Sequence, residues 1–150
     1  MAYPLIGNYG VPGEEVDAHG LPIHFESKCI QVAGLVVCQY SHEASHWSAN
    51  RTLGQWLKSQ GIPALTGVDT RHLIKHIRDA GSTLAKLIPA DTPPQSLLFD
   101  DPNERNLVAE VSLKEPMVYG SGDITICMVD CGVKYNQVRC FVERGVRVKV

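Results

Sequence analysis

A continuous apolar run near the end of the chain, 124–130 (ITICMVD), limits the fold more than any other feature. A run of this length without polar alternation is typical of a parallel strand that is buried on both faces. Cys131-Gly132 provides a turn after it. The apolar spacing then predicts a helix over 135–144 and a second strand from Arg147. This pattern indicates the opening βαβ unit of a parallel α/β sheet. Such a sheet needs further strands, so we expect the chain to be truncated inside this domain.

The remainder of the chain predicts a mixed α+β domain. Seven glycines and prolines within the first 25 residues indicate turns and loops packed on a scaffold. The β-branched run 30–40 predicts one buried strand, and 83–88 is a candidate for a short one. Four prolines within 89–102 indicate a loop, and 119–123 (YGSGD) indicates a linker before the apolar run.

Two helices with recognisable ends are expected in this domain. The first covers 47–59, with Ser45 or Ser48 as its cap and Gly61 at its end. Its inward face is formed by residues at three- and four-residue spacing, namely Trp47, Asn50, Leu53, Trp56 and Leu57. The second begins at a cap on Asp69 or Thr70 and ends at Gly81. Its apolar stripe consists of Leu73, Ile74 and Ile77.

Charge and cysteine content exclude several classes of protein. The net charge is −2 and no block of basic residues occurs, so nothing supports binding of nucleic acid or of an anionic membrane. The five cysteines form no CxxC pair, and three lie in apolar strand-like runs or on a helix face. We expect these to be buried free thiols in a reducing compartment. No signal peptide is evident, and we expect an intracellular protein.

The segment from His42 to His46 (HEASH) matches the zinc-binding pattern HExxH. On a helix this spacing places two imidazoles on one face, with Glu43 available to activate water. Ser45 and Ser48, however, predict a helix start after the motif, which puts the two histidines in a loop. We therefore interpret the match as accidental, and a zinc hydrolase remains only as an alternative.

Three further patterns have a structural interpretation that we prefer. His72 and His76 lie four apart on the second helix and are expected on a solvated polar face. Gly120-Ser121-Gly122 precedes a strand, whereas a phosphate cradle precedes a helix. Cys131 lies where α/β proteins bind ligands, but it lacks a nucleophile elbow and an assured base, so we interpret it as a structural thiol.

Several segments resemble the small chain of carbamoyl-phosphate synthetase, in the order in which they occur in that family. They are 3–10 (YPLIGNYG), 45–47 (SHW) with the Trp56-Leu57 pair, 61–63 (GIP) with 67–71 (GVDTR), and 130–134 (DCGVK) with Asn136. Details such as 48–53 (SANRTL) and 135–140 (YNQVRC) resemble animal-type synthetases. Among these, a pyrimidine-pathway type is favoured and a urea-cycle or arginine-pathway type is the alternative.

The resemblance implies both a domain layout and an activity. It implies an N-terminal small-chain domain over 1–118, incomplete at its start, a linker over 119–123, and the start of a class I glutamine amidotransferase domain over 124–150. The parent enzyme would hydrolyse glutamine through a Cys-His-Glu triad and pass ammonia to a synthetase region that uses ATP and Mg²⁺. The expected partner is that synthetase region, in cis or in trans. The expected location is the cytoplasm, or the mitochondrion for the urea-cycle type.

The same resemblance places the chemistry outside this chain. The family's glutamine-contacting Ser precedes the YPLIGNYG segment, and its nucleophile elbow and His-x-Glu pair follow the second strand. We therefore assign no catalytic, cofactor-binding or metal-binding residue. Cys131 does not match the family's nucleophile. The expected role of this chain is structural and docking, and a non-catalytic interaction module is the alternative from another class.

Overall fold

The computed structural model describes residues 4–150, so Tyr3 of the YPLIGNYG segment lies outside the described residues. The described chain forms two compact units. The first contains residues 4–13 and Cys29–Asp101, and the second contains Glu14–Lys28 and Pro102–Val150. Helices and strands occur in both units, which confirms the mixed α and β character expected from the sequence. Within 4–150, no helix is both long and apolar enough to cross a bilayer.

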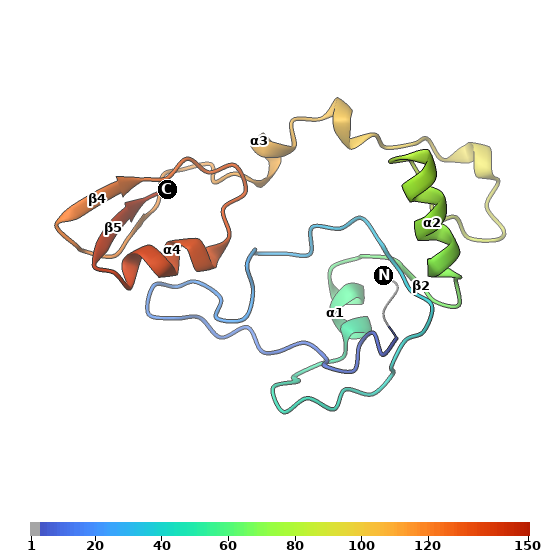
Figure 1. The fold of residues 1–150 in the computed structure, drawn as a ribbon, viewed down its shortest axis with the longest axis horizontal. Coiled ribbons are helices and arrows are strands. Elements are labelled where there is room, and N and C mark those ends of the chain that lie inside the picture. Colours follow the sequence, from blue (N-terminus) through green and yellow to red (C-terminus); the bar gives the residue numbers. More distant parts are fainter. Residues whose placement is uncertain (1–3) are drawn as a thin grey trace. The chain divides into compact units, whose positions relative to one another are not determined.

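The first unit contains two helices and a small parallel sheet (Figure 1). The strands β1 (Leu35–Val36) and β2 (Ala64–Leu65) pair in parallel. The helices are α1 (Leu53–Ser59) and α2 (Thr70–Ala80), followed by a 3-10 turn, η1 (Pro94–Ser96). The buried apolar side chains of this unit come from separate segments, namely Ile6, Val11, Val37 and Leu57.

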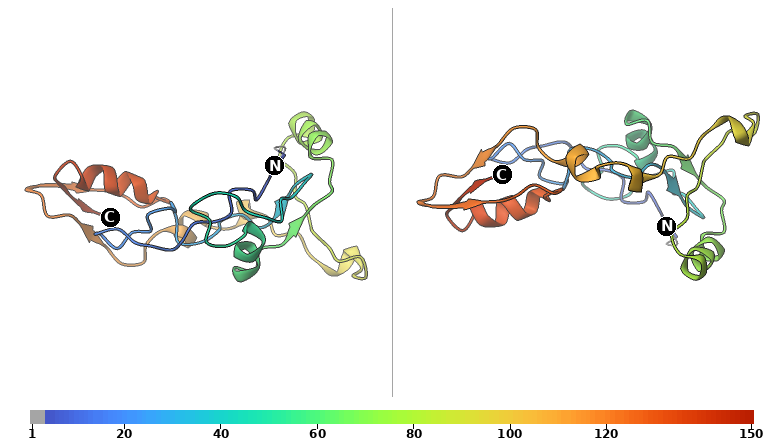
Figure 2. Two further views of the ribbon diagram at one scale, coloured as in Figure 1. Left: turned by 90° about the horizontal axis from the view of Figure 1, so that it is seen from below. Right: turned by 90° about the horizontal axis from the view of Figure 1, so that it is seen from above.

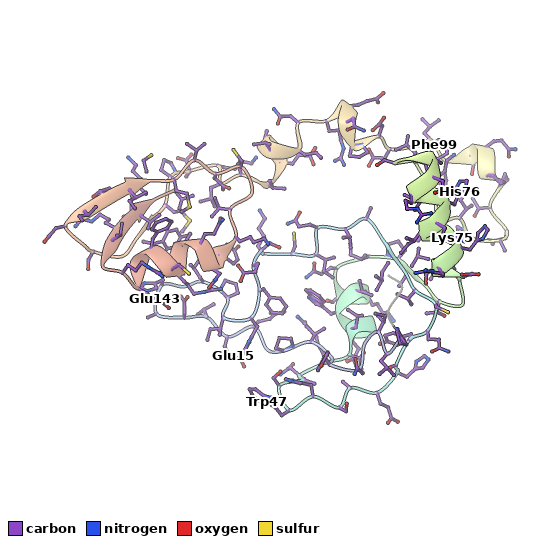
Figure 3. The ribbon with its side chains drawn as sticks, in the orientation of Figure 1. Glu15, Trp47, Lys75, His76, Phe99 and Glu143 are labelled. Atoms are coloured by element: carbon purple, nitrogen blue, oxygen red, sulfur yellow. The ribbon has the colours of Figure 1, made fainter. Side chains whose placement is uncertain are left out.

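Helix α1 begins six residues later than the apolar spacing predicts. Thr52 accepts a hydrogen bond from the Gln55 N–H at 3.2 Å, while the Gln55 side chain accepts one from the Thr52 N–H at 2.8 Å. This reciprocal capping box satisfies two amides at once and fixes the helix start. Ser45 and Ser48 are therefore not the cap. Trp47 lies outside the helix, 89% exposed, and points away from the ribbon (Figure 3).

Tyr40 connects the amino-terminal segment to α1. Its hydroxyl accepts a hydrogen bond from the Gly54 N–H at 2.9 Å, in the first turn of the helix. The Ser41 N–H donates to the Ile6 carbonyl, and a Cβ on Gly7 would lie 2.6 Å from the Tyr40 ring. Gly7 also has a φ of +98°, which favours glycine. Gly7 of the YPLIGNYG segment is thus needed because the backbone there passes against the Tyr40 ring.

Helix α2 has the ends that the sequence predicts. Asp69 caps it, accepting a hydrogen bond from the His72 N–H at 2.9 Å, and it ends at Gly81, whose φ is +83°. The stripe of Leu73, Ile74 and Ile77 is 37%, 46% and 38% exposed, so it is not covered as an inward face would be.

The strand predictions for the first unit are only partly correct. Within the run 30–40, the paired strand is limited to two residues, although the neighbouring Val37 is 1% exposed. Residues 83–88 form no strand in the described structure. There, Lys86 instead donates to the Leu97 carbonyl and lies over the Phe99 ring at 4.1 Å, so this segment is held by side-chain contacts.

The second unit contains the predicted βαβ. The strand β4 (Ile124–Cys127) pairs in parallel with β5 (Val146–Lys149), and α4 (Tyr135–Val142) connects them. A strand that the sequence did not predict, β3 (Val118–Tyr119), pairs antiparallel with β5, so the sheet order is β3-β5-β4. A short helix, α3 (Leu107–Val111), and a 3-10 turn, η2 (Pro102–Glu104), precede the sheet.

The core of this unit lies between α4, β5 and an amino-terminal segment. Helix α4 packs along β5 (Figures 1 and 2). Its Val138 is buried with Val148 of β5, Tyr119 of β3 and Leu21, which comes from the segment 14–28. The sequence placed that segment in the other domain. Leu21 is 4% exposed, so the segment supplies part of this hydrophobic core.

Two expectations of burial are wrong. Ile124 of β4 is 68% exposed, although its apolar run predicted a strand buried on both faces, because within 4–150 the sheet is covered on one face by α4. The cysteines are also more accessible than expected. Cys29, Cys38, Cys127 and Cys131 are exposed, and Cys140 is intermediate. Their positions in apolar runs therefore do not bury them, and among the five only Cys127 lies in a strand.

We expect Leu57→Ala to lower the free energy of unfolding by about 2–5 kcal/mol, because Leu57 is buried and its removal leaves a cavity. Trp47→Ala is the matched control and should change stability by less than about 0.5 kcal/mol, as for an exposed side chain. Urea denaturation followed by circular dichroism measures both. A larger loss for Trp47→Ala than for Leu57→Ala would show that the helix does begin near Trp47.

Candidate functional site

The turn after β4 is the place where an α/β unit binds ligands, and Asp130 organises it. One oxygen of Asp130, Oδ1, accepts hydrogen bonds from the Gly132 N–H at 2.9 Å and the Val133 N–H at 3.0 Å. The other, Oδ2, accepts one from the Leu113 N–H at 2.7 Å. The Ser112 hydroxyl donates to the Asp130 carbonyl at 2.6 Å. Asp130 therefore fixes the turn and connects it to Ser112 and Leu113, the two residues after α3.

Asp130 is ionised more readily than a free carboxyl group. Burial by itself would raise its pKa, but hydrogen bonds from the Val133, Leu113 and Gly132 amides outweigh that effect and lower the pKa below its usual value of 3.8. Three amide donors stabilise the carboxylate and leave it little freedom to take up a proton. Asp130 is thus suited to hold the backbone and not to act as a general base.

Cys131 follows Asp130 and is exposed. Within residues 4–150, no hydrogen bond or ion pair joins its thiol to a histidine or a carboxylate. A nucleophilic cysteine needs a base or cation that favours the thiolate. The interpretation of Cys131 as a structural thiol stays a prediction.

The HExxH pattern does not form a zinc-binding face. The segment 42–46 has no helical structure, so the four-residue spacing does not align the two rings. The His46 ring lies against Tyr9, with centroids 5.2 Å apart, and its Nδ1 is 2.7 Å from the Ser48 hydroxyl. The His42 ring instead lies edge-on to Tyr40, with centroids 4.9 Å apart. Across the described part of the chain, no three His, Cys, Asp or Glu side chains are grouped to hold a metal ion.

The remaining sequence candidates lie on α2 and in the segment before β4. His72 and His76 are exposed on α2, as expected for a polar face, and Figure 3 shows His76 beside Lys75. Gly120 has a φ of +73°, and a Cβ there would lie 2.8 Å from the Val146 carbonyl oxygen. A Cβ on Gly122 would overlap the Gly145 carbonyl. These glycines let the chain pass against the start of β5.

Sequence patterns did not predict the polar cluster around Arg139 in the second unit. Arg139 of α4 donates from Nη1 to the Pro22 carbonyl at 2.9 Å, and the same nitrogen lies 3.7 Å from Asp17 Oδ2. Its Nη2 lies 3.5 Å from Glu26 Oε1. Because these partners are more than 110 residues apart along the chain, no local pattern relates them.

Asp17 is the more enclosed carboxylate of this cluster. Its side chain is 18% exposed, and that of Arg139 is 14% exposed. Burial alone would raise the pKa of Asp17, but amide hydrogen bonds from Leu21 and His19 and the nearby charges of His19 and Arg139 outweigh it and lower the pKa. The ionised form of Asp17 is therefore the one that the fold stabilises.

The lowered pKa of Asp130 predicts a loss of stability in acid. Because the folded pKa lies below the unfolded value of about 3.8, the stabilisation is complete above that pH and is lost as the pH falls through the folded pKa. Asp130→Asn should therefore flatten the dependence of the unfolding free energy on pH below about 4. Asp123→Asn, at an exposed position, is the control. Identical pH profiles for Asp130→Asn and wild type would contradict this role.

The loop structure of 42–46 predicts that the purified chain holds no stoichiometric zinc. His42→Ala should change the unfolding free energy by less than about 0.5 kcal/mol, as for other exposed side chains. Metal analysis of the dialysed protein and denaturation of the variant measure the two quantities. One zinc ion per chain that is lost in His42→Ala would show that a zinc site exists.

Known proteins match this chain over its whole length. The family model for the carbamoyl-phosphate synthase small chain, CPSase domain, matches residues 1–87. The multifunctional protein CAD of Squalus acanthias is 54% identical over 100% of this chain, which covers 7% of that protein. The mitochondrial carbamoyl-phosphate synthase [ammonia] of Rattus norvegicus is 49% identical over 99% of this chain, or 10% of that protein.

A separate small chain also matches. The carbamoyl phosphate synthase arginine-specific small chain of Saccharomyces cerevisiae is 44% identical over 98% of this chain and 36% of its own length. The chain therefore spans much less than two thirds of the relatives that it matches. Because the family model covers more than half of the chain and its motifs recur in order, the chain belongs to the carbamoyl-phosphate synthase small-chain family.

Proposed function

We propose that this chain is part of a glutamine-dependent carbamoyl-phosphate synthetase of pyrimidine biosynthesis. In the complete protein, the small region would hydrolyse glutamine, and the ammonia would supply an ATP-dependent synthesis of carbamoyl phosphate. The observation that carries this proposal is the 54% identity to the multifunctional protein CAD of Squalus acanthias across the whole chain. A further multifunctional relative, pyr-3 of Neurospora crassa, is 45% identical over 100% of the chain and supports the same pathway.

The alternative pathway has support of the same kind. Relatives at 49% and 44% identity are named as a mitochondrial ammonia-type synthase and an arginine-specific small chain. The pyrimidine type is preferred because the multifunctional relative has the higher identity. It implies a cytoplasmic protein, whereas the ammonia type implies a mitochondrial one.

We propose the domain layout 1–118 for the small-chain N-terminal domain, 119–123 for a linker and 124–150 for the start of a class I glutamine amidotransferase domain. The support is the family match over 1–87 and the parallel β4-α4-β5 unit that begins at Ile124. This layout divides the chain by the similarity of its sequence to the family. The compact units follow a different division, since 14–28 packs with 102–150.

The chain contributes a framework to this enzyme. Its β4-turn-α4 segment would form the first layer of the amidotransferase sheet, with Asp130 holding the turn. We assign no catalytic, cofactor-binding or metal-binding residue to it. ATP and Mg²⁺ would act in the synthetase region of the parent enzyme, whose chemistry lies outside this chain.

A docking role is the second proposed function, and α2 supports it. Its three apolar side chains, Leu73, Ile74 and Ile77, are each more than a third exposed on one helix that also carries Lys75 and Arg78. Exposed apolar stripes of this kind typically contact another surface. The proposed partner is the synthetase region of carbamoyl-phosphate synthetase, in cis or in trans.

We expect the 150-residue chain to hydrolyse no glutamine above background, even with a synthetase partner supplied. Cys131 has no base and no oxyanion donors assigned to it, and positioning alone contributes roughly 7–11 kcal/mol to such reactions. The assay measures glutamate and ammonia released from glutamine, with Cys131→Ser as the control. Turnover that disappears in Cys131→Ser would show that the chain has a complete active site of its own.

A further inference from the structure

The segment 14–28, which we call the strap, is folded around Asp17. Asp17 Oδ1 accepts hydrogen bonds from the His19 N–H at 2.8 Å and the Leu21 N–H at 3.0 Å. The Asp17 N–H donates to the Leu21 carbonyl at 2.8 Å, and Val16 pairs antiparallel with Pro22. The strap is thus a small hairpin whose tip places Leu21 in the core of the second unit.

Glu26 of the strap contacts the first turn of α4. Its Oε2 accepts a hydrogen bond from the Asn136 N–H at 2.8 Å, and its carbonyl accepts one from the Tyr135 N–H at 3.4 Å. The residue at the cap position of α4, Lys134, provides no side-chain cap. Free amides at a helix start need an acceptor, and a carboxylate there also interacts favourably with the helix dipole. The strap therefore supplies the cap that the helix sequence lacks.

Arg139, one turn further along α4, lies beside two carboxylates of the strap, Asp17 and Glu26. It lies 3.7 Å from Asp17 Oδ2 and 3.5 Å from Glu26 Oε1, and it donates to the Pro22 carbonyl. Asp17 Oδ2 is buried, and among the described residues it accepts no hydrogen bond. Removing the arginine would leave this buried charge without its ion-pair partner, which is more costly than removing an exposed pair.

From these contacts we propose that Arg139, Asp17 and Glu26 form an ionic clasp that closes the strap over α4. When the contacts of Arg139 with Asp17 and Glu26 break, the strap opens and the rest of the chain stays folded. Opening withdraws Leu21 from Val138, Val148 and Tyr119 and removes the cap of α4. The strap is therefore a conformational device that controls whether α4, the helix of the βαβ unit, is ordered.

Hydrogen–deuterium exchange of the full chain, resolved by peptide, tests the proposal. In Arg139→Met, the amides of 14–28 and of the first turn of α4 should exchange at least about tenfold faster than in wild type. The amides of α1, in the other unit, should be unchanged. Arg144→Met is the matched control, since Arg144 is an exposed arginine whose guanidinium donates to the Cys140 carbonyl, and it should leave the strap unchanged.

Two further variants separate charge from volume. Asp17→Asn keeps an amide oxygen for the turn but removes the charge, so it should also speed exchange of the strap. Its effect should largely disappear when Arg139 is already Met, because the two groups act through one contact. Arg139→Lys retains the charge and should give a smaller effect than Arg139→Met.

Three results would overturn the proposal. The strap amides of the wild type exchanging as fast as those of the loop 89–102 would show that no clasp exists. Unchanged exchange in Arg139→Met would show that the apolar contact of Leu21 alone holds the strap. Equal acceleration of the strap and of α1 would show global unfolding and not a strap that opens by itself.

Discussion

The contact of the strap with α4 is the interaction on which the second unit depends. Its sheet has three short strands, and its buried centre consists of four side chains, of which Leu21 comes from the strap. The strap also caps α4 through Glu26, and its Asp17 carboxylate neutralises the charge of Arg139. A single helix on a small sheet buries little apolar surface, so one added apolar side chain and one cap are a large share of what stabilises it.

Local signals in the sequence predicted the elements that local interactions determine. Helix α2 is bounded by Asp69 and Gly81 as predicted, because a cap and a left-handed glycine act within one turn. The β4-α4-β5 unit was predicted from its apolar runs and is present. The start of α1 was misplaced because three-residue apolar spacing extends back to Trp47, whereas the Thr52–Gln55 capping box decides where the helix begins.

The strap was missed because its partners are distant in sequence. Arg139 and Pro22 are separated by 117 residues, and no pattern within the strap itself indicates a partner that far along the chain. The candidate sites also depend on their structural surroundings, which the sequence pattern alone does not contain. HExxH implies zinc only on a helix, and 42–46 is not helical, while Asp130 proves to be a turn residue held by three amides. The family was identified from several motifs that occur in the expected order. The geometry of any single site in 4–150 would not have identified it.

The central claim is that α4 is ordered by a carboxylate more than a hundred residues before it. The Cα chemical shifts of residues 135–142 in Glu26→Ala test this directly. We expect the helical shifts of the first turn to move toward random-coil values, while Glu143→Ala, at the other end of the same helix, leaves that turn unchanged (Figure 3). Helical shifts in Glu26→Ala that match the wild type along the whole of α4 would contradict it.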